Sequence, residues 1–213
     1  MVYKPALLRS KSPFIPPCLP TVRKEAPTGL AWVHEVKFDG YRLQLHKEGQ
    51  DVALFSKNGN HFTGRFTDIA VAARSIPAKS VILDCELTAC FDDGRPDFSS
   101  LLHKREVPLC VWVFDILSYL GRDLRPLTFS ARRMKLNKLM ARVHDPMFRG
   151  SETFLDPHAL FKACSDRRME GIVSKRVDRP YQSGPSQDWI KVKCPEWREE
   201  NSWRHEFFAK AKD

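Results

Sequence analysis

The chain has 213 residues, 42% of them hydrophobic and 14 of them phenylalanine, which is enough for a substantial core in one large domain or two small ones. Lys and Arg outnumber Asp and Glu by 35 to 26, and the formal net charge of +9 favours a polyanionic partner. The six cysteines have no CxxC or zinc-like spacing and no apolar run could span a bilayer, so we expect a soluble, cytoplasmic protein without structural zinc.

In chain order, the first segment is a proline-rich arm. Prolines at 13, 16, 17, 20 and 27 favour an extended segment over residues 1–30, which we expect to pack along a domain formed by 31–197 and followed by a polar tail at 198–213. Alternating or apolar runs predict strands at 32–37, 41–47, 52–56, 81–91, 109–117, 171–176 and 189–193. Helices are predicted near 65–75, over 128–142 and from the Asp156-Pro157 pair. The apolar positions of helix 128–142 are Met134, Leu136, Leu139 and Met140.

The strand at 81–91 divides its side chains between two faces. Its apolar face comprises Val81, Leu83, Cys85, Leu87 and Ala89. The opposite face carries two carboxylates, Asp84 and Glu86. Both carboxylates fit an ordinary solvated strand face, and we expect Asp84 to be solvated.

One lysine stands at the end of a predicted strand, directly before an Asp-Gly turn. Alternation places Glu35 and Lys37 on one face, while Val36 and Phe38 point the other way. A lysine on a strand is ordinarily a solvated surface residue. It becomes a nucleophile where nearby cations, a metal ion or poor solvation favour loss of its proton.

The segments that follow Lys37 favour the second interpretation. After KFDGYR come Ser56-Lys57-Asn58-Gly59, Asp84-Cys85-Glu86, Val113-Phe114-Asp115, Glu170-Gly171-Ile172-Val173-Ser174-Lys175 and Trp189-Ile190-Lys191-Val192-Lys193. This series resembles the motifs of the covalent nucleotidyltransferases, which comprise ATP-dependent DNA ligases, RNA ligases and mRNA capping enzymes. HEVKFDGYR, EGIVSKR and DWIKVK are most similar to the ligase domain of bacterial ATP-dependent DNA ligases used in end joining. The resemblance covers residues 13–197.

The resemblance implies a fold and a nucleophile. The fold is α+β, the adenylation fold of twisted, mostly antiparallel sheets flanked by helices, with ATP in a cleft between them. Lys37 would attack the α-phosphate of ATP and carry AMP, and Arg42, Lys191 and Lys193 would hold the phosphates and favour the neutral amine. We expect Lys191 to be the more critical of the two C-terminal lysines. Lys57 stands where most relatives carry arginine, and it keeps the charge without bidentate phosphate binding.

The resemblance also assigns carboxylate and aromatic groups. Glu170 would bind Mg²⁺, and Glu86 would bind the metal through water or contact the ribose. Phe114 would stack on adenine, and Glu35 would accept a hydrogen bond from its exocyclic amine. Cys85 replaces a usual glycine, and we expect it to be tolerated because it faces away from Glu86.

The implied activity is ATP-dependent sealing of nicked DNA or DNA ends, as in DNA repair, by a nucleoid-associated protein that is monomeric by default. Relatives continue after the last motif into an OB-fold domain. Because only residues 194–213 follow it here, we expect no OB domain. Without that domain we expect slow self-adenylylation by ATP and easier sealing of pre-adenylylated nicks. An OB-fold or end-joining protein would then act as a partner in trans. Two alternatives stay open: a non-catalytic DNA-end or nick-binding module, and an RNA ligase or capping-type nucleotidyltransferase.

Overall fold

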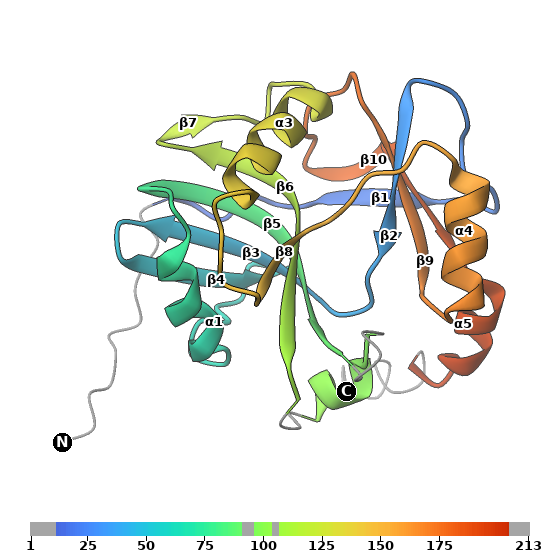
Figure 1. Ribbon diagram of the computed structural model, residues 1–213, viewed down its shortest axis with the longest axis horizontal. Coiled ribbons are helices and arrows are strands. Elements are labelled where there is room, and N and C mark those ends of the chain that lie inside the picture. The colour runs from blue at the N-terminus through green and yellow to red at the C-terminus, as the bar shows by residue number, and fades with distance from the viewer. Residues whose placement is uncertain (1–11, 91–95, 104–106, 205–213) are drawn as a thin grey trace.

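The computed structural model describes residues 12–90, 96–103 and 107–204, which form two β-sheets flanked by helices (Figure 1). The smaller sheet has four strands in the order β1 (Cys18–Val22), β10 (Gly184–Lys193), β9 (Gly171–Arg176) and β2 (Trp32–Lys37). β1 runs parallel to β10, and the other pairs are antiparallel. The predicted arm therefore contributes an edge strand to the sheet.

The larger sheet has six strands. Its order is β4 (Asp51–Ser56), β3 (Tyr41–Glu48), β5 (Ser80–Ala89), β6 (Leu109–Tyr119) and β7 (Arg122–Asp123), with β8 (Phe148–Gly150) parallel to β6. The chain crosses from the smaller to the larger sheet through residues 38–40, between β2 and β3. The predicted mixed fold with mostly antiparallel sheets is confirmed.

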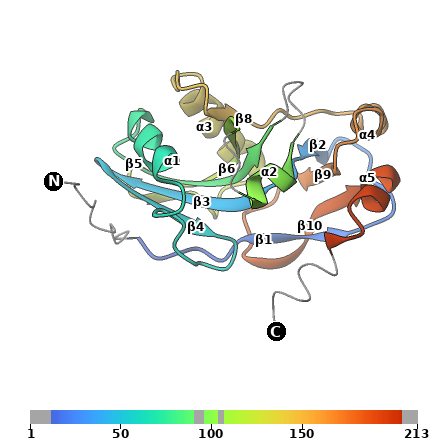
Figure 2. The same ribbon diagram turned by 90° about the horizontal axis from the view of Figure 1, so that it is seen from below.

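The helices cover the outer face of each sheet. α1 (Thr67–Ala72), the 3₁₀ turn Ala73–Ser75, α2 (Phe98–Leu102) and α3 (Phe129–Met140) pack on a core that includes Leu43, Leu83, Cys85 and Val111 of the larger sheet. α4 (Pro157–Asp166) and α5 (Pro195–Glu200) cover the smaller sheet through a second cluster around Leu160, Ile172, Val192 and Trp197. Figure 2 shows α1 on one side of the larger sheet and β1 and β10 on the other.

The strands of both sheets and the turns beside them carry buried charged side chains. A small apolar cluster joins the sheets, and it contains Ile15, Cys18, Ile82, Leu117, Tyr181 and Trp189. Beside it lie the buried polar side chains of Glu35, Asp84, Asp115, Glu170 and Lys175. Because apolar surface goes to the two outer cores, the space between the sheets is left for ionic groups.

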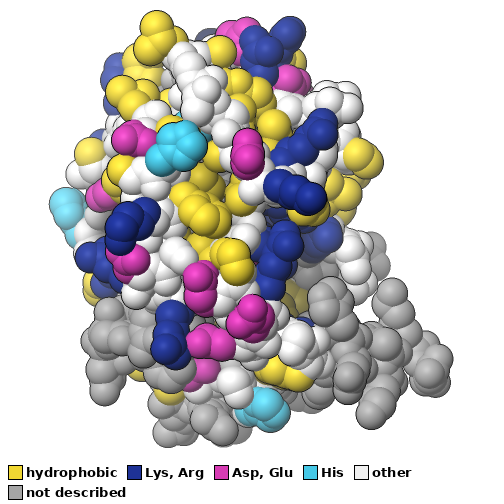
Figure 3. Space-filling model, turned by 90° about the vertical axis from the view of Figure 1, so that its right-hand side faces the viewer, with side chains coloured by type: hydrophobic (Ala, Val, Ile, Leu, Met, Phe, Trp, Pro, Cys, Tyr) yellow, Lys and Arg dark blue, Asp and Glu magenta, His cyan; other side chains and the backbone are white. Residues whose placement is uncertain are grey.

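The surface on the side of α4 and α5 is unevenly charged. Basic side chains gather along one edge of this face, and acidic side chains gather in a separate area below its centre (Figure 3). The excess of Lys and Arg over Asp and Glu in the whole chain is therefore not spread evenly over this side.

Most predicted elements are confirmed to within two residues, including both helix starts. Thr128 caps α3 by accepting from Ala131 N, and Asp156 caps α4 by accepting from His158 N and Ala159 N. β10 begins at Gly184 rather than at residue 189. The predicted tail lies largely outside the described residues. No helix in the described ranges is long and apolar enough to cross a membrane.

One helix buries charged residues that its apolar positions do not indicate, and one prediction about burial is wrong. Met134 is 58% exposed, whereas Arg132 and Arg133 of the same helix are buried with Leu136 and Leu139. The helix turns these arginines inward because each has an ionic partner there. Asp84 is 1% exposed rather than solvated, because it pairs with Arg42, whose side chain is itself only 14% exposed.

Candidate functional site

Glycine at position 171 allows two lysines to approach one carboxylate. Gly171 of β9 is paired with Lys37 of β2 on one side and with Lys193 of β10 on the other. A Cβ at Gly171 would lie 2.0 Å from the carbonyl oxygen of Val192, and its φ of +145° is one that other residues rarely adopt. The close strand spacing therefore requires glycine, and the residue before it, Glu170, lies between the two lysines.

Glu170 bridges these lysines. Its Oε2 is 2.7 Å from the Lys37 Nζ and its Oε1 is 2.7 Å from the Lys193 Nζ, and the side chain is only 5% exposed. Burial by itself would raise the pKa of Glu170, but the two ammonium groups outweigh it and hold that pKa below its usual value. A carboxylate paired in this way fixes the positions of both amines.

Carboxylates set the charge state of Lys37 in the ligand-free protein. Burial on its own would lower the pKa of Lys37, but the carboxylates of Glu170, Glu86 and Asp39 outweigh it and raise that pKa. In the ligand-free protein the nearest charges are these carboxylates, which favour the charged amine. The expectation that cations and a bound metal ion favour loss of the proton stays a prediction for the nucleotide-bound site.

The turn after Lys37 is held by contacts from both sides. A Cβ at Gly40 would lie 2.0 Å from the Leu87 carbonyl oxygen, so only glycine lets the turn approach β5. The Asp39 carboxylate receives two 2.7 Å bonds from Arg204 and a 3.3 Å bond from the Trp197 indole. Residues after the last strand therefore fix the loop that carries Lys37.

Lys191 is a cation of this site without a counterion in the described part of the chain. Among the described residues its ammonium group has no hydrogen bond or ion pair. Its pKa is lowered, first by burial and then by the positive charges of three other lysines: Lys37, Lys193 and Lys57. Like charges at these positions repel, and an anion bound among them would relieve that repulsion.

Glu86 is a carboxylate without a partner. No described residue donates a hydrogen bond to it, and burial, only partly offset by Lys37 and Arg42, raises its pKa to about 8. Glu170 and Asp39 raise it further. No cluster of three His, Cys, Asp or Glu side chains suited to a metal occurs in the described ranges. The pair of carboxylates Glu86 and Glu170 fits Mg²⁺, which takes one or two protein carboxylates together with phosphate oxygens and waters.

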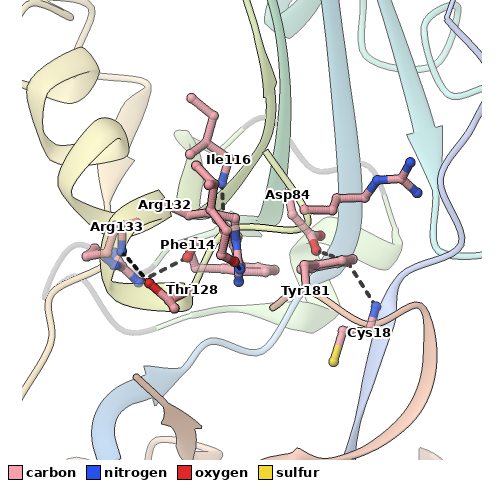
Figure 4. Close-up of polar contacts among 12 residues, drawn as sticks. Cys18, Asp84, Phe114, Ile116, Thr128, Arg132, Arg133 and Tyr181 are labelled. Atoms are coloured by element: carbon pink, nitrogen blue, oxygen red, sulfur yellow. Dashed lines mark hydrogen bonds and ion pairs between the residues drawn. The ribbon is translucent and has the colours of Figure 1, made fainter. Parts of the chain in front are cut away.

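Arg42 lies in a closed hydrogen-bonded ring. Its guanidinium donates to both Asp84 oxygens at 2.9 and 2.7 Å and to the Cys18 carbonyl at 2.9 Å. The Tyr181 hydroxyl donates to Asp84 at 2.6 Å and accepts from the Cys18 amide at 2.9 Å, and Figure 4 shows the chain from Asp84 through Tyr181 to Cys18. Asp84 raises the pKa of Arg42 against the opposing effect of burial. Arg42 is thus committed to protein partners.

The predicted adenine residues lie together, but in an ionic setting that the sequence did not predict. Phe114 is partly buried, with the Arg42 guanidinium 5.1 Å and the Lys175 ammonium 4.6 Å from its ring centroid. Glu35 is 2% exposed and pairs with Lys175 and Arg133. Figure 4 shows Arg133 beside Phe114.

Sequence reasoning missed Lys175, Arg132 and Arg133. The signal for the arginines was present, because Phe129, Arg132, Arg133, Leu136 and Leu139 follow the spacing of one helix face. Lys57, the remaining predicted residue, is exposed and acts on Lys191 through its charge. Lys37, Lys191, Lys193, Glu86 and Glu170 therefore form one group that combines an amine, free positive charge and carboxylates.

Comparison with known proteins gives one consistent result. Residues 21–193 match the family model described as ATP dependent DNA ligase domain. The multifunctional non-homologous end joining protein LigD of Pseudomonas aeruginosa is 33% identical over 186 residues, covering 85% of this chain and 22% of LigD. A probable DNA ligase of Dictyoglomus turgidum is 32% identical over 177 residues, covering 75% of this chain and 30% of that protein.

A solved structure agrees with these matches. The structure described as mycobacterial DNA ligase D complexed with ATP and MES aligns with a TM-score of 0.76 and 28% identity. The alignment covers 84% of this chain and 60% of that one. The chain spans less than a third of the length of the two curated relatives above.

Proposed function

Since the chain belongs to the ATP dependent DNA ligase domain family, we propose that it is an ATP-dependent DNA ligase acting through a lysyl-AMP intermediate on Lys37. The Lys37 Nζ attacks the α-phosphate of ATP, so that a nitrogen–phosphorus bond forms, the bond to the β-phosphate oxygen breaks and pyrophosphate leaves. The amine must first lose its proton. The ion pair with the Glu170 Oε2, 2.7 Å away, opposes this loss in the ligand-free protein.

Binding of the phosphates is assigned to the lysines of β10. Lys191 has no counterion among the described residues, so it can bind a phosphate without breaking an existing ion pair. Lys193 is shared with Glu170 and packs 4.4 Å from the ring centroid of Trp197. Charge that develops on the phosphate oxygens in the transition state is stabilised where these cations are already fixed in place. Arg42 reaches a phosphate only by exchanging one of its protein partners.

Glu86 and Glu170 would hold Mg²⁺, which would neutralise phosphate charge and favour the neutral amine of Lys37. Phe114 is proposed to stack on adenine and Glu35 to accept from its 6-amino group. AMP then passes from Lys37 to the 5′-phosphate of a nick, and the 3′-hydroxyl displaces it to seal the strand. Nicked DNA or DNA ends are the proposed substrate, in keeping with the net charge of +9.

The observation that carries this proposal is the shared carboxylate. Glu170 brings the Lys37 amine and the phosphate-binding strand β10 to the same point. A site for DNA binding alone does not need an amine and a carboxylate fixed in this way. It would also leave the half-buried Glu86, which has no hydrogen-bond partner among the described residues, without a role.

The test is covalent labelling. Wild-type protein incubated with α-labelled ATP and Mg²⁺ should carry the label through denaturing electrophoresis, and Lys37→Ala should not. Lys162→Ala is the matched control, because Lys162 is a lysine on α4 that is 77% exposed and pairs with Asp166 rather than with Glu170. Label on the Lys37→Ala protein would refute the assignment of the nucleophile. Sealing of a pre-adenylylated nick is assayed separately, since it does not require ATP.

A further inference from the structure

Glu35 is held through one of its two carboxylate oxygens. The Glu35 Oε1 is 2.8 Å from the Lys175 Nζ and also receives a bond from the Arg133 Nη2. Within the described part of the chain, no donor reaches the other oxygen, Oε2. The carboxylate therefore has a fixed direction and one acceptor atom left over.

The two cations that hold Glu35 are themselves held. The Arg133 Nη1 donates to the Ser151 carbonyl at 2.7 Å, and the Nη2 also donates to the Phe114 carbonyl at 3.0 Å. Lys175 is 2% exposed, and its ammonium lies 4.2 Å from the Trp189 ring centroid and 4.6 Å from that of Phe114. Strand β6, which carries Phe114, is thus tied to strand β2, which carries Glu35, through helix α3 and strand β9.

The ion cluster of Glu35, Arg133 and Lys175 is better suited to orienting the Glu35 carboxylate than to stabilising the fold. Burying an ion cluster costs desolvation energy that its attractions often only repay, and apolar residues of similar volume commonly stabilise a core as well. Burial lowers the pKa of Lys175 even though Glu35 opposes it, which indicates how unfavourable this position is for a charge. What the cluster provides is a carboxylate whose direction is set.

We propose that Arg133 and Lys175 are positioning residues for base selection, which hold the Glu35 Oε1 so that Oε2 faces the 6-position of a bound purine. A 6-amino group donates to Oε2, whereas a 6-oxo group presents a second acceptor and is repelled. Sites built around a fixed hydrogen-bonding group reject the wrong partner far more strongly than apolar sites do. This inference rests on the proposed function, because it assumes that Lys37 takes a nucleotide from ATP.

The test compares ATP with inosine triphosphate, which carries an oxygen in place of the 6-amino group and a proton on the neighbouring N1. The measured quantity is the ratio of kcat/KM for lysyl labelling by the two nucleotides. Wild type should prefer ATP by about 100-fold or more. Arg133→Gln should lower that ratio at least tenfold, mainly through a higher KM for ATP, with kcat changed less than threefold.

Two further variants keep the test decisive. Lys135→Gln removes the same charge from an exposed position of the same helix, and its ratio should equal that of wild type. Arg133→Lys keeps the charge but cannot reach Glu35 and both carbonyls together, so it should fall between Arg133→Gln and wild type. If Arg133→Gln fails to fold, the ratio measured for Arg133→Lys tests the inference in its place.

The outcomes separate the two levels of the account. No label from ATP on wild type would contradict the proposed function itself. Labelling of wild type with equal use of both nucleotides would overturn the inference alone. So would an unchanged ratio in folded Arg133→Gln or, where that protein does not fold, in Arg133→Lys.

Discussion

Replacing Gly171 by alanine should separate the two strands that bring Lys37 and Lys193 to Glu170. The new Cβ would lie 2.0 Å from the Val192 carbonyl oxygen and 2.8 Å from the Lys193 Cα, and both are backbone atoms that cannot rotate away. Overpacking of this kind costs about 1–3 kcal/mol, and the positive φ adds about 1–2 kcal/mol. The expected loss in the free energy of unfolding is therefore about 2–5 kcal/mol, a large part of the total for most domains.

Urea unfolding measures this loss against a matched control. Gly121→Ala places alanine at a φ of +75°, where a Cβ meets nothing within 4 Å, so it carries a positive-φ cost without the clash. Gly171→Ala should be less stable than Gly121→Ala by about 1–3 kcal/mol. It should also lose labelling by ATP under conditions in which it remains folded. Equal destabilisation of the two variants would show that close approach of β9 and β10 is not required.

Three other predictions concern the charged groups. Lys191→Ala should lower the rate of lysyl labelling by about 10²–10³-fold while changing the urea midpoint little, because the lysine has no ionic partner among the described residues; a large loss of stability would contradict this. The pKa of Glu86 is raised to about 8, so between about pH 5 and 8 the folded protein binds a proton that the unfolded chain does not. Its stability without metal should therefore fall as pH rises through that window, with a slope of at most about 1.4 kcal/mol per pH unit. Glu86→Gln should remove this pH dependence. In a double-mutant cycle, Asp39→Asn and Arg204→Ala should show a coupling energy of about 1–3 kcal/mol in unfolding; additive effects would mean that the bidentate pair does not hold the loop.

Hydrophobic alternation predicted the fold well where one face of a strand is apolar. Cys85 shows this, since its neighbours Leu83 and Leu87 fix the core face and it lies in the core, away from Glu86, as expected. The first strand was missed because residues 18–22 include Pro20 and alternate poorly, and they form a strand only by pairing with β10. Tertiary contact, not local pattern, decides that segment.

The site was predictable in its members but not in their pairing. The motifs identified Lys37, Glu170 and Lys193, and the structure joins them. Period-two alternation says which side a residue faces, yet it does not say which charge it meets there. Asp84 was expected in solvent for this reason, although Arg42 and Tyr181 bind it in the interior.

The most direct test of the central claim is to locate the adenylate by peptide mass mapping after incubation with ATP and Mg²⁺. The account predicts one adenylate, bound to Lys37 through an acid-labile nitrogen–phosphorus bond and lost on adding pyrophosphate. An adenylate on Lys191 or Lys193, or one that pyrophosphate does not remove, would contradict it.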